Sequence, residues 1–294
     1  MTHRLMTHRY LKFVWLGFVL VLASPHVNAI DLQPGDVIAP KPDISAAQLT
    51  YQYSEKNEFY SHGDKQAGRP AYHSSIYALR VGHSFEVAQM PAYFYAQVPF
   101  GAVHSKGMGG DSGLGDTTFA VAVWPYADRS AKTYLGAALY LTVPTGSYDS
   151  NRYFNMGDNR YWTAVQVGYE RPLVDKLAGM VAFDAVFFGD NTDAPKPNQH
   201  KKLEKDVLYT AQFGVRYDFN PQYSLTGTYY YTAGGETTYD GLDSNNATRL
   251  QRYQLSGIGN YSFGRITVHY SSDLKTENGY FEDDRLTLRY TMRF

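Results

Sequence analysis

Apolar and polar side chains alternate residue by residue along much of the chain. In the C-terminal segment the apolar set is Leu286, Leu288, Tyr290, Met292 and Phe294, and the intervening polar set is Arg285, Thr287, Arg289, Thr291 and Arg293. A helix would mix the two sets on every face, whereas a β-strand places them on opposite faces. The segment therefore predicts a strand with one apolar face and one polar face.

About twelve segments carry this alternation, and most of them are ten or more residues long. They cover about 45–56, 74–88, 89–102, 114–127, 131–145, 159–172, 177–190, 204–219, 222–234, 249–263, 264–276 and 282–294. Strands of soluble β-sandwiches also alternate, but they are shorter, and their apolar faces do not so often begin and end in Tyr or Phe. The segments predict an all-β fold, namely a transmembrane antiparallel β-barrel of about twelve strands.

The connections between these segments differ in length in a regular way. Those after the even-numbered segments are tight and lie near Ala88-Gln89, Ala127–Ala131, Pro172–Lys176, Phe219–Gln222 and Phe263-Gly264. Those after the odd-numbered segments are mostly long and polar and cover 57–73, 103–113, 146–158, 191–203 and 235–248. Outer-membrane barrels have short periplasmic turns and longer extracellular loops. This asymmetry predicts that both termini lie on the periplasmic side.

The first 29 residues have the features of a signal peptide. A basic start precedes the uncharged apolar run 13–23, and Val27 and Ala29 match the small-residue cleavage pattern. A transmembrane helix is the rival interpretation, but the run is too short to cross about 30 Å of hydrocarbon. We expect cleavage after Ala29 and a location in the outer membrane of a Gram-negative bacterium. Met1 and Met6 both remain open as the start of translation.

Residues 30–44 precede the first predicted strand. Pro34, Pro40 and Pro42 predict an extended segment that does not join the sheet. The favoured interpretation is a disordered periplasmic leader, and the alternative is a segment that folds into the lumen as a partial plug. The chain thus divides into a signal peptide (1–29), this segment (30–44) and a barrel (45–294).

The composition narrows the range of partners. Lys and Arg number 27 and Asp and Glu number 28, so no excess of positive charge points to nucleic acid. The absence of cysteine excludes disulfides, Cys-ligated metals and a lipid-modified N-terminal cysteine. The 27 Tyr and 16 Phe residues suit aromatic girdles at the two lipid–water boundaries of a barrel. Outer-membrane lipids and lipopolysaccharide are therefore the expected surroundings.

The chain ends in Phe294, on the apolar face of the last predicted strand. A terminal Phe in this position resembles the signal by which the barrel-assembly machinery recognises its clients. That machinery is therefore an expected partner, with Phe294 as the assembly signal.

Four stretches stand out within the chain after Ala29. They are Asp31–Asp36 (DLQPGD), Gly113–Phe119 (GLGDTTF), Tyr140–Asp149 (YLTVPTGSYD) and Asn155–Thr163 (NMGDNRYWT). They resemble, in sequence and in order, the MetA-pathway of phenol degradation family of outer-membrane proteins, which are described as transporters. The resemblance implies a barrel associated with the catabolism of aromatic compounds. It supplies no catalytic or ligand-binding residues.

Polar residues that alternate inward are the candidate functional set. Charged side chains face lipid only at a high cost in free energy, so the alternation assigns them to the lumen. The lumen-lining candidates are Arg80, Glu86, Gln166, Asp184, Gln212, Arg216, Asp218, Tyr230, Arg252, Gln254, His269, Asp273, Arg285, Arg289 and Arg293. They either pair and fill the barrel or line a solute path, and both alternatives stay open. The basic row at 285, 289 and 293 would attract anionic solutes such as aromatic carboxylates.

Other chemistry has weaker support. An alternating strand, and not a helix, follows the Gly-rich stretch 107–116, so we expect a flexible loop there and no phosphate site. Calcium at Asp111 and Asp116 is a weaker alternative. The histidines after Ala29 lie mainly in predicted loops, and no serine with a strong nucleophile context lies on a strand next to the inward His269. We therefore predict no catalytic residues, no metal and no cofactor.

These features predict a channel rather than an enzyme. We expect a porin-like transporter that takes up small aromatic or hydrophobic compounds by passive or facilitated diffusion. The alternatives are a structural or adhesive surface barrel and a membrane-embedded hydrolase. The sequence leaves open the solute, the oligomeric state and whether the lumen is open or plugged.

Overall fold

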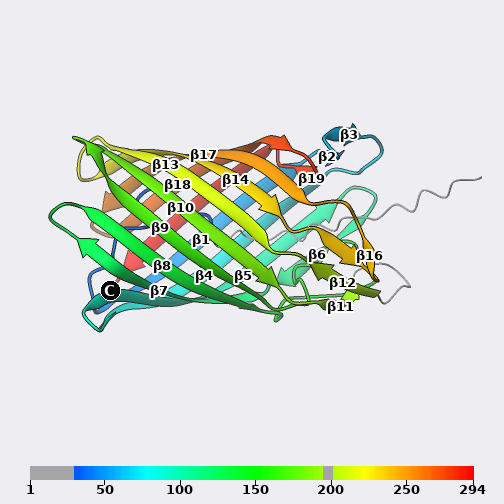
Figure 1. Ribbon diagram of the computed structural model, residues 1–294, viewed down its shortest axis with the longest axis horizontal. Coiled ribbons are helices and arrows are strands. Elements are labelled where there is room, and N and C mark those ends of the chain that lie inside the picture. Colours follow the sequence, from blue (N-terminus) through cyan, green and yellow to red (C-terminus); the bar gives the residue numbers. More distant parts are fainter. Residues whose placement is uncertain (1–29, 195–200) are drawn as a thin grey trace, which may run out of the picture.

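The computed structural model describes residues 30–194 and 201–294, so the predicted signal peptide and its cleavage site lie outside the described residues. Within that part, twelve strands form one closed antiparallel barrel (Figure 1). They are β1 (Ile44–Lys56), β4 (Tyr72–Val87), β5 (Met90–Ser105), β7 (Thr117–Asp128), β8 (Thr133–Val143), β9 (Trp162–Val174), β10 (Leu177–Phe188), β13 (Leu208–Asp218), β14 (Tyr223–Gly234), β17 (Thr248–Tyr261), β18 (Gly264–Thr276) and β20 (Asp284–Arg293).

Each barrel strand pairs with its neighbours in sequence, and pairing of β1 with β20 closes the ring. The predicted fold class and strand number are confirmed. Every predicted strand end lies within four residues of the observed one. The described part of the chain holds no long apolar helix of the kind that spans a bilayer.

The apolar faces of the strands point out of the barrel. Leu288, for example, lies between Tyr51 on β1 and Val268 on β18. Leu288, Val268 and many other large apolar side chains around the ring are about half exposed. Such a continuous apolar surface would aggregate in water, whereas acyl chains solvate it in a membrane. The outward apolar faces therefore form the lipid-facing surface.

The two ends of the barrel differ. At one end, here called the short-turn end, tight connections join the strands, and the C-terminus lies at this end (Figure 1). The turn between β4 and β5 consists of Ala88 and Gln89, which have φ values of 46° and 64°. Two consecutive residues with positive φ are typical of the type I′ hairpin turn, whose twist matches that of the strands. The short connections predicted from the sequence are found here.

The opposite end, here called the loop end, carries small sheets. β2 (Glu58–Ser61) pairs with both β3 (Asp64–Gln66) and β19 (Gly279–Phe281), and β11 (Asn191–Ala194) pairs with β12 (Lys201–Lys205). β15 (Thr237–Tyr239) joins β12 to β16 (Leu242–Asp243). Several of the long connections predicted from the sequence therefore contain short strands that link one loop to another.

The Gly-rich stretch 107–116 is more ordered than the sequence suggested. Residues Gly109–Leu114 form β6, which extends the sheet along β5, so the prediction of a flexible loop is wrong there. The Asp111 carboxylate accepts hydrogen bonds from Arg152 (2.7 Å) and from the Met156 N–H (2.9 Å). The Asp116 carboxylate accepts the N–H groups of Gly146 (2.8 Å) and Asp158 (2.7 Å). These two acids therefore hold the loop 146–158 in place. Among the described residues, no group of three His, Cys, Asp or Glu side chains could hold a metal ion.

Aromatic side chains gather on the outer surface toward both ends. Toward the short-turn end, Tyr261 and Phe263 stack with ring centroids 5.1 Å apart. Toward the loop end, Tyr77 stacks on Phe100 at 5.4 Å and contacts Tyr51 at 4.9 Å. Tyr and Phe at these heights place an apolar ring against lipid and leave the hydroxyl near water. The pattern fits a barrel that spans a membrane.

Candidate functional site

The segment that precedes β1, residues 30–43, lies inside the barrel. Near the short-turn end, the guanidinium of Arg129 donates to the carbonyls of Ala39 (3.0 Å) and Pro40 (2.7 Å). Further in, Trp124 Nε1 donates to the Val37 carbonyl at 2.7 Å. The barrel wall thus satisfies carbonyl groups of a segment that has no strand partner of its own.

The same segment continues toward the middle of the lumen. The Tyr230 hydroxyl donates to the Leu32 carbonyl (2.7 Å), and the Leu32 N–H donates to Gln212 Oε1 (2.9 Å). Gln33 is 2% exposed. The structure shows an ordered luminal segment and not the disordered leader that the sequence favoured. The segment turns at 33–36, where the Asp36 N–H donates to the Gln33 carbonyl (2.9 Å), and the wall supplies further hydrogen-bond partners.

A glycine on the inner wall makes room for the segment. At Gly214 on β13, a Cβ atom would lie 2.6 Å from Pro34 Cγ. Contacts this short do not occur between real side chains, so only glycine lets the wall approach the proline ring. The sequence of the inner wall is therefore fitted to a chain segment that occupies the lumen.

Acidic groups of the segment pair with arginines of the wall. The Asp31 carboxylate lies 2.5 Å from Arg252 Nη2 and 3.4 Å from Arg285 Nη1. The Asp36 carboxylate lies 3.6 Å from Arg289 Nη1. Charges removed from water require such partners, so the segment balances part of the positive charge that the wall brings into the lumen.

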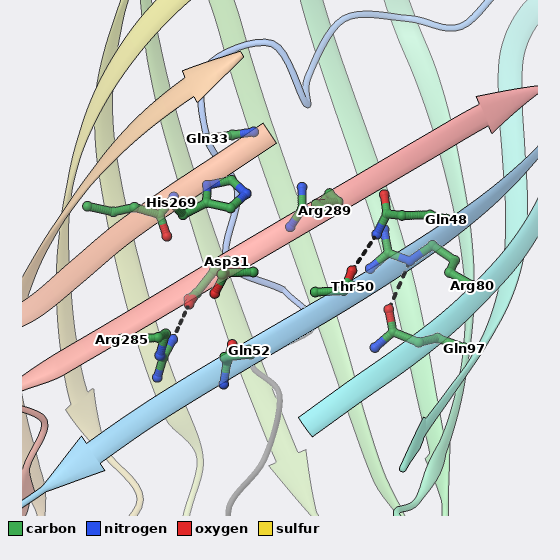
Figure 2. A pocket seen from close by; sticks show the side chains of 12 residues that line it. Asp31, Gln33, Gln48, Thr50, Gln52, Arg80, Gln97, His269, Arg285 and Arg289 are labelled. Carbon is green, nitrogen blue, oxygen red and sulfur yellow. Dashed lines mark hydrogen bonds and ion pairs between the residues drawn. The ribbon is translucent and has the colours of Figure 1, made fainter. Parts of the chain in front are cut away.

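A cavity remains between the segment and the wall formed by β1, β4, β5, β17, β18 and β20 (Figure 2). The cavity is small, with a volume of about 40 Å³. Its lining consists of Asp31, Gln33, Gln48, Thr50, Gln52, Arg80, Gln97, Gln254, His269, Arg285, Thr287 and Arg289. Three arginines face one aspartate, so the cavity favours anions or the electron-rich face of a neutral solute.

Arg80 shows how the barrel wall holds a cavity arginine in a fixed orientation. Its guanidinium lies 4.1 Å from the centre of the Tyr95 ring, and its Nε donates to Gln97 Oε1 at 2.9 Å. One edge of the guanidinium is thus fixed, while aromatic packing orients the plane. An arginine held in this way can present its remaining N–H groups to a carboxylate.

The structure separates the lumen-lining candidates into three groups. Buried on the inner wall are Gln166, Asp184, Gln212, Tyr230, Arg252, Gln254, His269, Asp273 and Arg285. Half-buried are Arg80, Arg216, Asp218 and Arg289. Exposed at the short-turn rim are Glu86 and Arg293. The cavity brings together five candidates, namely Arg80, Gln254, His269, Arg285 and Arg289.

Several luminal side chains form hydrogen bonds and ion pairs with one another and with the luminal segment. Arg216 donates to Glu170 at 2.5 Å and to Asp218 at 3.0 Å. Glu170 also accepts the Gly35 N–H at 2.6 Å. This network spans two strands and the luminal segment, so its charges are used in holding the segment against the wall.

One serine lies beside the inward histidine. Ser256 on β17 and His269 on β18 are directly opposite in register, and Ser256 Oγ lies 2.9 Å from His269 Nδ1. No carboxylate of the described residues hydrogen-bonds to His269, and Ser256 is 1% exposed. The N–H groups around the pair belong to the strand ladders, which leaves no oxyanion site of the kind that acyl transfer requires.

Sequence reasoning missed the acceptors and amides that complete the cavity. Asp31, Gln33 and Asp36 lie on the segment that was not placed inside, and Gln48 and Gln52 are inward but uncharged. A usable signal was present in both cases. The two acids of the segment complement the excess of luminal arginines, and the amides follow the same alternation as the charged residues.

Residues 47–290 match the sequence profile of the family described as "Putative MetA-pathway of phenol degradation". The chain belongs to this family. The family predicted from the four sequence stretches is therefore confirmed. No curated protein sequence matches the chain.

Among solved structures, this family member is similar to the COG4313 outer membrane channel from Pseudomonas putida F1. The two share 30% sequence identity with a TM-score of 0.85, over 90% of this chain and 100% of the other. The β domain of the Bordetella autotransporter BrkA is 11% identical with a TM-score of 0.50, over 85% of this chain and 100% of that domain, and it shares the fold alone.

Proposed function

We propose that this protein is an outer-membrane channel through which small aromatic or otherwise hydrophobic compounds enter by passive or facilitated diffusion. The observation that carries the proposal is the cavity between the luminal segment and the barrel wall. It presents Arg80, Arg285 and Arg289 beside neutral amides, which suits weak contact with small amphipathic solutes. The similarity to the Pseudomonas putida channel and the family membership support it.

The solute that best fits this lining is a small aromatic carboxylate. Its carboxylate would compete with Asp31 and Asp36 for the arginines of the wall. The electron-rich face of its ring would suit the same guanidinium groups. Replacing one carboxylate by another conserves the number of ion pairs, so the segment can loosen without leaving a buried charge unpaired. Entry would follow the concentration gradient and would use neither a cofactor nor energy coupling.

The placement in the membrane follows from the two ends of the barrel. In this proposal the short-turn end faces the periplasm, the signal peptide is removed after Ala29, and the loop end meets lipopolysaccharide. The lipid-facing surface contacts outer-membrane lipids. The chain needs the barrel-assembly machinery to insert into the membrane. Catalysis plays no part, because the Ser256–His269 pair lacks an orienting acid among the described residues.

Transport can be tested with the purified protein in liposomes. We expect swelling in candidate aromatic carboxylates at a rate above that of empty vesicles, and a several-fold lower rate for Arg80→Ala, which removes a cavity arginine that forms no ion pair with the luminal segment. Arg249→Ala is the matched control, since that side chain is 66% exposed and lies outside the cavity. Equal swelling with and without protein, together with unchanged growth of a gene-deletion strain on scarce aromatics, would contradict the proposal.

An adhesive or structural role is the second candidate, and the ordered loop 146–158 favours it. That role predicts the opposite sensitivity: deletion of residues within the loop would abolish surface binding, while Arg80→Ala would have no effect. Cell-binding assays on the same set of variants separate the two functions.

A further inference from the structure

Asp184 on β10 is a carboxylate without a cation. It lies on the inner wall and is 0% exposed. Its Oδ1 accepts the side-chain N–H groups of Gln212 (2.7 Å) and Gln166 (3.4 Å), whereas its Oδ2 has no hydrogen-bond partner among the described residues. No Lys, Arg or His of the described chain forms an ion pair with it. A buried carboxylate in this state is costly, because two neutral amides do not neutralise its charge.

The same two amides also hold the first residue after the predicted cleavage site. Gln166 Nε2 donates to the Ile30 carbonyl at 2.6 Å, and Gln212 Nε2 lies 3.4 Å from it. Ile30 itself packs against the apolar cluster that contains Ala164 and Val186. The Ile30 carbonyl and the Asp184 carboxylate are therefore neighbours, bridged by shared donors.

Cleavage after Ala29 would change the charge at this point. It would convert the amide nitrogen of Ile30 into an α-ammonium group, and this nitrogen lies about 3 Å from the carbonyl oxygen of its own residue. The group would also become free to turn, since the preceding residue is gone. Processing would thus place a full positive charge within reach of a buried acid that has an open oxygen.

We propose that Asp184 is the receptor for the processed N-terminus, with its Oδ2 paired to the α-ammonium of Ile30. The pair locks the luminal segment at its free end, while the ion pairs of Asp31 and Asp36 hold the residues that follow. The lock can form only after the signal peptide is removed, so ordering of the segment is coupled to processing. This inference rests on cleavage after Ala29 and is independent of which solute the channel carries.

The test measures the reactivity of the N-terminal amine in the full mature protein. Intact mass first establishes that the chain begins at Ile30. An amine-selective reagent is then applied to folded protein in detergent at neutral pH, and labelling of the N-terminal peptide is followed by mass spectrometry. We expect labelling about ten times slower, or more, than in the boiled protein, because a buried, paired ammonium is shielded from the reagent. The exposed Lys132 and Lys176 serve as internal references.

Two variants isolate the pairing. Asp184→Asn keeps the shape of the side chain and should raise the labelling rate of Ile30 about tenfold or more. Asp175→Asn, in an exposed short turn, is the matched control and should leave the rate unchanged. Besides Asp184→Asn, the other test variant inserts one alanine between Ala29 and Ile30. The insertion moves the α-ammonium group one residue away from Ile30 and leaves the barrel sequence intact. It should raise the rate in the same way, even if Asp184→Asn fails to fold.

The outcomes are distinct. An N-terminus other than Ile30 would overturn the inference together with the proposed processing. A wild-type amine that reacts as fast as in the boiled protein would overturn the pairing alone. Slow labelling that persists in the inserted variant would also overturn it. None of these results bears on transport, which the liposome experiment measures separately.

Discussion

At the residue scale, a few charges decide whether the lumen is filled. Arg252 lies in the inner wall with its guanidinium over the Tyr230 ring, and Asp31 is its ion-pair partner. Its side chain is 4% exposed, so it has little access to water if that partner is lost. The pair therefore connects the luminal segment to the barrel wall.

Removing the acid should release the segment. For Asp31→Ala we expect a loss of about 3–5 kcal/mol in the free energy that holds the segment in place, because Arg252 is left buried and unpaired. Single-channel recording in planar bilayers should then show a higher open probability than in wild type. Asp243→Ala, on the exposed β16, is the control. An unchanged open probability would show that Asp31 does not hold the segment.

Phe294 tests assembly at the same scale. Its N–H and carbonyl form paired hydrogen bonds with Ser45, both 2.9 Å, and its side chain is 68% exposed on the lipid-facing surface. We expect deletion of Phe294 to lower the yield of folded barrel, measured as the fraction that migrates faster on a gel without boiling. Phe263→Ala, which removes a similarly exposed ring at a short turn, is the control. Equal folded yield at every expression level would make the terminal Phe incidental.

At the element scale, β13 and the luminal segment pack so closely at Gly214 that only glycine, which has no Cβ atom, fits there. Gly214→Ala would place a Cβ 2.6 Å from Pro34 Cγ, so the segment must shift while the wall keeps its strand pairing. We expect a higher open probability with an unchanged heat-modifiable gel shift. Gly257→Ala is the matched control, since its Cβ would meet nothing within 4 Å. A loss of folded barrel in Gly214→Ala alone would instead assign the segment a role in folding.

The loop 146–158 offers a second test at this scale. Asp116→Ala removes the acceptor of two loop N–H groups, which should cost about 1–3 kcal/mol in local stability. Trypsin cleavage after Arg152 should therefore become about tenfold faster, since proteolysis follows the population of the opened loop. Asp64→Ala, in the exposed β3, serves as the control. Cleavage at the wild-type rate would mean that contacts other than those to Asp116 order the loop.

At the scale of the whole molecule, the barrel closes on itself, so it has no unpaired strand edge that the surrounding lipid would have to cover. We expect the purified mature protein to be rich in β-structure by circular dichroism and to stay compact in detergent until boiled. N-terminal sequencing should begin at Ile30. A largely helical spectrum would contradict the fold, and retention of Arg9 would mean that the first residues anchor the chain.

The sequence by itself determined the barrel. Two local properties of neighbouring positions, period-2 alternation and turn residues, predict three features of the barrel. These are the number of strands, the face of each strand that points outward and the end that carries the short turns. In lipid, an even number of antiparallel strands can satisfy all of its backbone hydrogen bonds only by closing into a ring. The closed barrel therefore follows from the strands themselves. This is why every strand could be placed to within four residues without knowledge of the tertiary structure.

Only the tertiary structure decided what fills the lumen. The segment 30–43 has no alternation, and its prolines fit a disordered leader as well as a plug. The choice between these depends on contacts with Arg129, Trp124 and Gly214, which come from strands distant in sequence. The Ser256–His269 contact and the open oxygen of Asp184 are of the same kind. Alternation assigns a side chain to the lumen, but the circumference of the closed barrel decides which luminal side chains meet.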